Sequence, residues 1–230
     1  VVGTNPSIAT INTWTETALI SSIGRSLYVS LTGNDISGNG SEIAPWRTIQ
    51  KAANEVLPGD IVYVKAGTYN EKVTLTRSGL ITNYITFRNF GNDTVTIDPP
   101  GCNIGTLCRS TPPPEGTALG FVLVGADYIR IKGFRIVDSF GAIHVGTGSE
   151  SIIIENNYAT GFSGGYAVKI GSTPASYSGS STAKKITVQN NVFEPSSEPT
   201  DQEYGTVSSS NNQGNHVFRN NTIDFKYVGK

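Results

Sequence analysis

Two similar segments in the second half of the chain carry side chains that could act as a base. GAIHVG contains His144 and GYAVKIG contains Lys169. Their apolar residues alternate, so both segments are predicted strands that point His144 and Lys169 outward from a core as neighbours in one column. DIVYVKAG and GFVLVG read as earlier copies of the same strand, which would add Tyr63 and Leu123 to this outward column. Either side chain serves as a general base only when its pKa lies near the working pH. The simpler alternatives are a solvated lysine and a surface histidine, because no carboxylate in the pattern is placed to orient His144.

Other side chains suggest sugar binding rather than proton transfer. Aromatic rings can stack on sugar rings, and we predict a glycan-facing set of tyrosines: Tyr63, Tyr166, Tyr177 and Tyr204. A hard cation needs six or more oxygen ligands, usually from several carboxylates. The carboxylates near these segments are scattered along the chain, so no metal site is predicted.

The two cysteines are close together in the segment GCNIGTLC. A disulfide between Cys102 and Cys108 would close a small loop, as is common in proteins of oxidising compartments. No histidine or further cysteine is nearby, which argues against a zinc site. We therefore expect an extracellular or cell-surface protein.

A short pattern returns along the second half of the chain. The copies read YIRIKGFRIVD from Tyr128, SIIIENNYAT from Ser151, KITVQNNVFE from Lys185 and NHVFRNNTID from Asn215. Strands this short cannot bury one face alone and must stack on the next copy, which predicts a solenoid. Asn157, Asn191 and Asn221 share one position of the pattern, and we expect them to form an amide ladder at a sharp turn.

Composition limits the fold and the partners. Charged residues make up 15% of the chain and the net charge is −1, so no nucleic-acid partner is predicted. There is no apolar run of about 18 residues, so no membrane insertion is predicted. Residues 46–57 read as an amphipathic helix, with Trp46 and Leu57 on its buried face, that ends at Pro58-Gly59 and caps the first coil. We divide the chain into an extended N-terminal arm, residues 1–26, and a solenoid domain, residues 27–230.

The order YVS-x-TGND, APWRTIQKAA and PGDIVYVKAGTY resembles the opening of secreted parallel β-helix proteins of the pectate-lyase-like superfamily. In particular, it is similar to the opening of family-9 pectate lyases and related surface proteins. The resemblance implies an all-β fold, a right-handed three-sided parallel β-helix of about six coils with an N-terminal capping helix. Because this fold hosts many functions, the resemblance alone does not imply catalysis.

Lyases of this superfamily hold calcium in an acidic cluster and place a lysine or arginine base on the third strand of the coil. GYAVKIG is similar to the segment that carries the catalytic lysine, which would give that role to Lys169. Gly164-Gly165 stand where that family presents calcium-binding carboxylates, and the outward column offers Leu123 and His144 instead of aspartate. Without the metal we expect Lys169 to stay protonated at neutral pH.

Three functions are consistent with these patterns. The first is a non-catalytic extracellular structural module without a cofactor. It would self-associate end to end into a surface filament, through the N-terminal arm and an uncapped C-terminal coil, or form part of a larger surface protein. The second is a glycan-binding or adhesive module with a polysaccharide partner. The third is a calcium-dependent polysaccharide lyase, in which Lys169 and His144 are the candidate catalytic residues.

Overall fold

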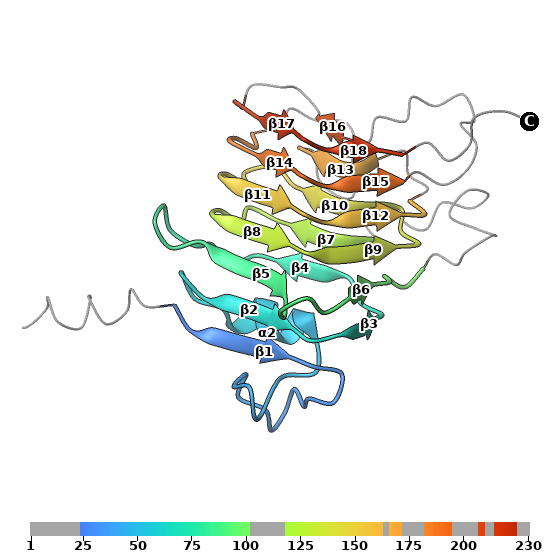
Figure 1. Cartoon of the computed structure of the whole chain (residues 1–230). Helices are drawn as coiled ribbons and strands as arrows, with labels where there is room; N and C mark the ends of the chain where they lie inside the picture. Colours follow the sequence, from blue (N-terminus) through green and yellow to red (C-terminus); the bar gives the residue numbers. More distant parts are fainter. Residues whose placement is uncertain are drawn as a thin grey trace, which may run out of the picture.

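In a computed structural model of the 230-residue chain, short strands stack into a three-sided column of parallel sheets (Figure 1). The structure describes residues 24–101, 118–162, 166–171, 182–194, 207–209 and 214–224. Within these residues every strand pairing is parallel, and each strand pairs with the equivalent strand of the next coil. This architecture is the predicted parallel β-helix.

The three sheets are numbered in the order in which the chain visits them. Sheet 1 has seven strands: β1 (Ser26–Val29), β2 (Ile61–Val64), β5 (Ile85–Asn89), β8 (Ile129–Lys132), β11 (Ile152–Glu155), β14 (Thr187–Gln189) and β17 (Val217–Arg219). Sheet 2 has six: β3 (Gly67–Tyr69), β6 (Val95–Ile97), β9 (Phe134–Val137), β12 (Tyr158–Thr160), β15 (Val192–Glu194) and β18 (Thr222–Ile223). Sheet 3 has five: β4 (Val73–Leu75), β7 (Leu119–Leu123), β10 (Gly141–Val145), β13 (Tyr166–Ile170) and β16 (Val207–Ser209).

The core is built from the apolar columns that the repeat predicts. Ile129 pairs with Ile152, and Ile131 pairs with Ile154. Ile154 pairs in turn with Val188. All of these side chains are buried in one continuous cluster, so the alternation of each copy becomes a column of contacts along the stack.

The predicted asparagine ladder stands between sheets 1 and 2. The Oδ1 atom of Asn191 accepts hydrogen bonds from the backbone N–H of Asn157 (2.9 Å) and from its Nδ2 (3.1 Å). Asn221 binds Asn191 in the same way, at 3.0 and 2.9 Å. The left-handed backbone falls one residue earlier than expected, with φ of 54° at Asn156 and 56° at Asn190. One asparagine therefore makes the turn and the next makes the ladder.

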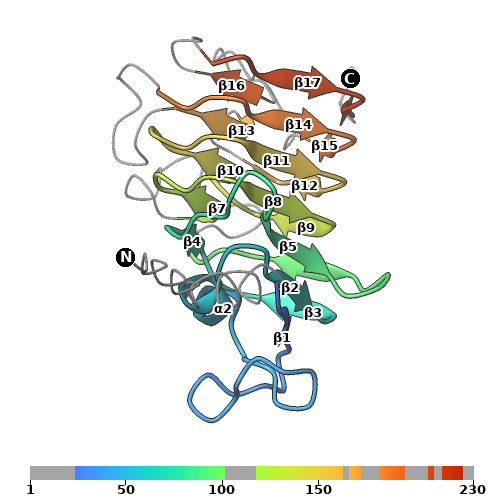
Figure 2. The ribbon, with the colours of Figure 1, turned by 90° about the vertical axis from the view of Figure 1, so that its left-hand side faces the viewer.

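A helix packs beneath sheet 3, beside the first coil (Figure 2). This helix, α2 (Ile49–Glu55), is shorter than the predicted span 46–57. Thr48 has extended backbone geometry and its side chain accepts from the N–H of Lys51, which fixes the helix start. Trp46 is buried but precedes the helix, and Leu57, expected on the buried face, is exposed because the chain is already extended at Val56.

The helix also satisfies the open edge of sheet 3. The side-chain amide of Gln50 donates to the carbonyl of Thr74 at 3.1 Å, and its oxygen accepts from the N–H of Thr74 at 2.7 Å. Thr74 lies on β4, the edge strand of that sheet. An edge strand with unmet backbone groups can pair with another chain, so Gln50 blocks such pairing at this position.

Two expected alignments are wrong. The segment DIVYVKAG forms β2 in sheet 1, where it pairs with β1 and β5, and is not the first strand of sheet 3. In sheet 3, His144 is in register with Val122, whereas Leu123 is in register with Val145 and points into the core. Aligning the flanking glycines of GFVLVG and GAIHVG gives a shift of one residue, and such a shift exchanges the two faces of a strand.

Replacing Asn191 by alanine should destabilise the fold by about 3 kcal/mol, because it removes the acceptor of two buried donors of Asn157. Urea unfolding followed by circular dichroism would measure the loss. Asn92→Ala, in an exposed loop, is the matched control. Equal unfolding free energies for the two variants would contradict a stabilising ladder.

Candidate functional site

The predicted base residues lie side by side in the middle of sheet 3. His144 on β10 is in register with Lys169 on β13, and Lys169 is in register with Ser208 on β16. Parallel strands are spaced about 4.8 Å apart. The two side chains that the sequence singled out are therefore neighbours on one face, as predicted.

This face is not the solvated surface that the sequence suggested. Every residue of β7 and β10 is buried, and His144 has no exposed area. The expectation of a surface histidine is therefore wrong. Both faces of these strands are covered, which period-2 alternation alone does not reveal.

Lys169 is partly buried, and burial lowers the pKa of its ammonium group below 10.5. Its Nζ atom lies 5.9 Å from the centre of the Tyr166 ring. The expectation of a solvated lysine is wrong, because the side chain is partly buried; its protonation at neutral pH stays a prediction. Desolvation disfavours the charged form, so a larger share of neutral amine is present, and neutral amine is the form that accepts a proton.

Tyr166 does not offer its ring to solvent. It is 5% exposed and its edge meets the ring of Phe140, with ring centres 6.0 Å apart. The glycan-facing assignment of Tyr166 is therefore wrong for the side chain as it stands. Its ring instead forms part of the apolar surroundings that desolvate Lys169.

Tyr63 lies on a different side of the column. It belongs to β2 in sheet 1, where its ring stacks on Tyr28 with centres 5.4 Å apart. Phe90 meets both rings at 6.0 Å. The two predicted glycan-facing tyrosines that the structure describes, Tyr63 and Tyr166, therefore lie on different sheets. The remaining predicted site residues lie outside the described residues: Tyr177, Tyr204, Cys102, Cys108 and Gly164-Gly165.

Sequence reasoning missed Tyr28, Phe90 and Arg88 as partners of Tyr63. The register of sheet 1 brings Tyr28, Tyr63 and Arg88 into one outward column. The signal was present in the similar segments LYVS and VYVK, which both place a tyrosine between two inward residues. It was lost because the second segment was assigned to the wrong sheet.

The described part of the chain offers no calcium site. Within it, no three histidine, cysteine, aspartate or glutamate side chains are grouped so that they could hold a metal ion. Among the same residues, no helix is long and apolar enough to cross a membrane. The calcium ligands of the lyases that the opening resembles are therefore not matched by the described residues.

The family of the chain follows from its sequence over most of this column. Residues 27–191, more than half of the chain, match the family model described as the Pel9A-like right-handed β-helix region. The chain belongs to the Pel9A-like right-handed β-helix family. Membership agrees with the all-parallel sheets and the turn ladder, and it confirms the right-handed β-helix that the opening implied.

Two curated relatives match parts of the chain. Pectate lyase PEL9 of Emericella nidulans is 26% identical over 162 residues, which are 65% of this chain and 38% of that protein. The uncharacterized protein YwoF of Bacillus subtilis is 38% identical over 74 residues, 32% of this chain and 16% of that protein. The chain thus spans less than two fifths of the length of either relative.

A solved structure supports the fold alone. The GH136 lacto-N-biosidase from Eubacterium ramulus superposes with a TM-score of 0.54 at 13% identity, covering 87% of this chain and 41% of that one. At this identity the likeness concerns the β-helix and not the chemistry. The Pel9A-like chain therefore shares its scaffold with proteins that act on carbohydrates.

Diethyl pyrocarbonate should modify only one of the two histidines in the folded protein. His144 is fully buried, whereas His216 is partly exposed, so peptide mapping by mass spectrometry should find the label on His216. Modification in urea is the control and should label both. Equal labelling of His144 under native conditions would contradict the closed face of sheet 3.

Proposed function

We propose that this Pel9A-like chain is the β-helix of an extracellular enzyme that cleaves an acidic polysaccharide by β-elimination, with Lys169 as the base. The observation that carries the proposal is the desolvated position of Lys169 on β13, in the segment similar to that of the lyase lysine. Membership of the Pel9A-like family and similarity to a pectate lyase support it.

The proposed step uses the neutral amine of Lys169. The amine takes the proton from the ring carbon that bears the carboxylate of a uronic acid. The electron pair of that C–H bond forms a carbon–carbon double bond as the bond to the glycosidic oxygen breaks, and the leaving oxygen then takes up a proton. Burial of Lys169 favours this chemistry because it raises the share of amine at a given pH.

The residues around Lys169 would hold the base in place. Strands β10 and β13 fix its backbone, and the ring of Tyr166 limits its access to water. His144 is too deeply buried to meet a polysaccharide, so we give it a packing role beside Lys169. The step is written for the lysine alone, because the described residues do not provide a calcium site.

Replacing Lys169 by alanine should abolish the formation of unsaturated products from polygalacturonate or alginate, measured by their ultraviolet absorbance. The wild-type rate should rise with pH to a midpoint below 10.5, because the amine must lose its proton and its pKa is lowered. Lys184→Ala, on an exposed lysine, should keep the wild-type rate. A wild-type chain without lyase activity, or an active Lys169→Ala variant, would refute the proposal.

End-to-end assembly as a structural module stays a prediction. Residues 1–23 of the predicted arm, residues 1–26, and the segment after Asp224 lie outside the described residues. Light scattering over a range of protein concentrations would test it, and a constant monomer mass would contradict it. A glycan-binding function is supported by a separate observation on sheet 1.

A further inference from the structure

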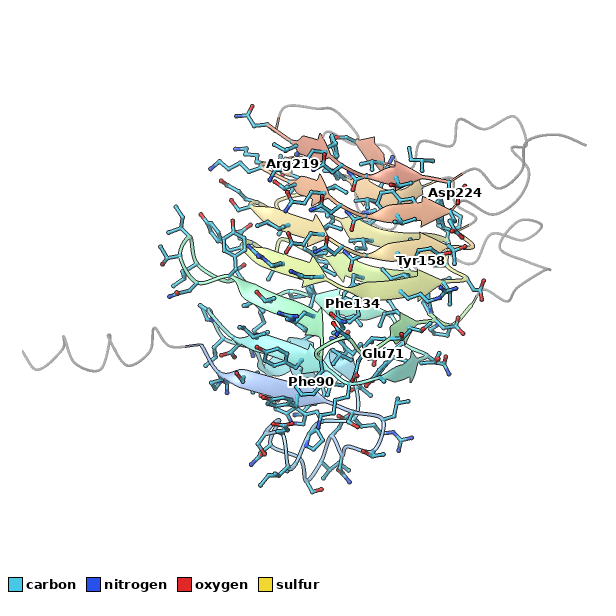
Figure 3. All side chains as sticks on the ribbon, in the orientation of Figure 1. Glu71, Phe90, Phe134, Tyr158, Arg219 and Asp224 are labelled. Carbon is cyan, nitrogen blue, oxygen red and sulfur yellow. The ribbon has the colours of Figure 1, made fainter. Side chains whose placement is uncertain are left out.

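An aromatic surface lies on the outer side of sheet 1, at its first two coils. We define it as Tyr28, Tyr63 and Phe90, whose rings are in mutual contact. All three side chains are partly exposed, and Figure 3 labels Phe90 near the end of the column that carries β1 and β2. Rigid strands fix the two tyrosines, so little side-chain freedom would be lost when a flat ligand binds.

Positive charges border this aromatic surface. The guanidinium carbon of Arg88 lies 5.8 Å from the centre of the Tyr63 ring. The ammonium of Lys65 lies 5.8 Å from the centre of the Tyr28 ring and 5.5 Å from that of Phe90. Lys132 follows Arg88 in register on the next strand. The surface therefore combines aromatic rings with cations on neighbouring strands.

Arg88 differs from the other cations of this surface because no carboxylate of the described residues pairs with it. Lys132 and Arg130 both lie beside the carboxylate of Glu155, at 3.6 and 3.3 Å, and Lys65 lies 3.8 Å from that of Glu42. In the part of the chain that the structure describes, no carboxylate lies within 4.0 Å of Arg88. Its hydrogen bond to the carbonyl of Asn89 uses Nε, at 3.3 Å, and a carboxylate could bind the terminal N–H groups.

We infer that this surface is a second carbohydrate site, which binds a polysaccharide that contains uronic acids. A sugar ring lies against the aromatic surface, and the carboxylate of the same or the next sugar binds Arg88. Tyr28, Tyr63, Arg88 and Lys132 follow one another across four neighbouring strands, so the sugar chain runs along the column. Beyond Lys132 the outward position belongs to Glu155, a buried carboxylate that Lys132 and Arg130 already pair with, so the run of cations available to a ligand ends there.

The second site is separate from the face that carries Lys169. Sheets 1 and 3 form different sides of the three-sided column, with sheet 2 as the remaining side (Figure 2). The chain as a whole has a net charge of −1, so attraction of an acidic polymer must come from a local basic surface. The site would hold a polysaccharide whether or not Lys169 cleaves it.

Calorimetric titration of polygalacturonate into the full chain tests the second site. Lys169→Ala serves as the background, so that cleavage does not disturb the measurement. Within it, Arg88→Gln and Tyr63→Ala should each weaken binding about tenfold or more. Arg88→Lys should lie between, because an ammonium cannot bind a carboxylate in the two-point geometry of arginine. Fully methyl-esterified polygalacturonate should bind at least tenfold more weakly, since it carries no charge.

Two matched variants control for general effects. Arg77→Gln removes one exposed positive charge that lies beside α2 and not beside sheet 1, and Tyr84→Ala removes a partly exposed ring of another cluster; both should bind as the background does. Tyr63→Phe keeps the ring and should retain affinity, so it remains informative even if Tyr63→Ala fails to fold. Wild-type affinity in Arg88→Gln and Tyr63→Ala, or equal binding of the methyl ester, would overturn the second site. If Lys169→Ala loses cleavage but binds polygalacturonate unchanged, the second site is supported. The cleavage proposal and the second-site proposal therefore fail independently.

Discussion

Backbone pairing between successive coils is the constraint on which the rest of this structure depends. No coil can satisfy the backbone N–H and C=O groups on the two edges of its short strands by itself, so each coil relies on hydrogen bonds to its neighbours. At the corner between sheets 1 and 2 the strands end, and asparagine amides continue the pairing where backbone bonds stop. Where the stack begins, Gln50 of α2 takes over the same task for Thr74. All outward side chains are positioned by this one repeated interaction.

The same pairing gives the three sides of the column different chemistry. On sheet 3, strands β7 and β10 are buried throughout, so Lys169 lies in surroundings that lower the pKa of its ammonium group. On sheet 1, the outward side chains from Tyr28 to Lys132 stay partly exposed and align into a column of rings and charges. A solenoid can thus keep a partly buried lysine and an exposed aromatic surface on two sides of one scaffold.

Register decides which residues meet. The column on sheet 1 changes from aromatic rings to cations and then to Glu155, whose carboxylate is also held by the amide of Gln189 at 2.7 Å. Arg219, labelled in Figure 3, continues this polar network by donating to Gln189 at 2.8 Å. The upper coils of sheet 1 therefore satisfy their own charges, whereas Arg88 has no carboxylate within 4.0 Å among the described residues.

The sequence by itself determined the β-helix, its apolar columns and the asparagine ladder, because these features repeat and each copy repeats the same local physics. It also identified His144 and Lys169 as neighbours. Only the tertiary structure showed that the face carrying His144 is buried and that Leu123 points inward and Val122 outward. It also showed that the Tyr63 ring contacts those of Tyr28 and Phe90. Register between coils depends on the length of the turns, and burial depends on what packs from outside. The alternation of apolar residues within a single strand specifies neither the register nor the burial of its outer face.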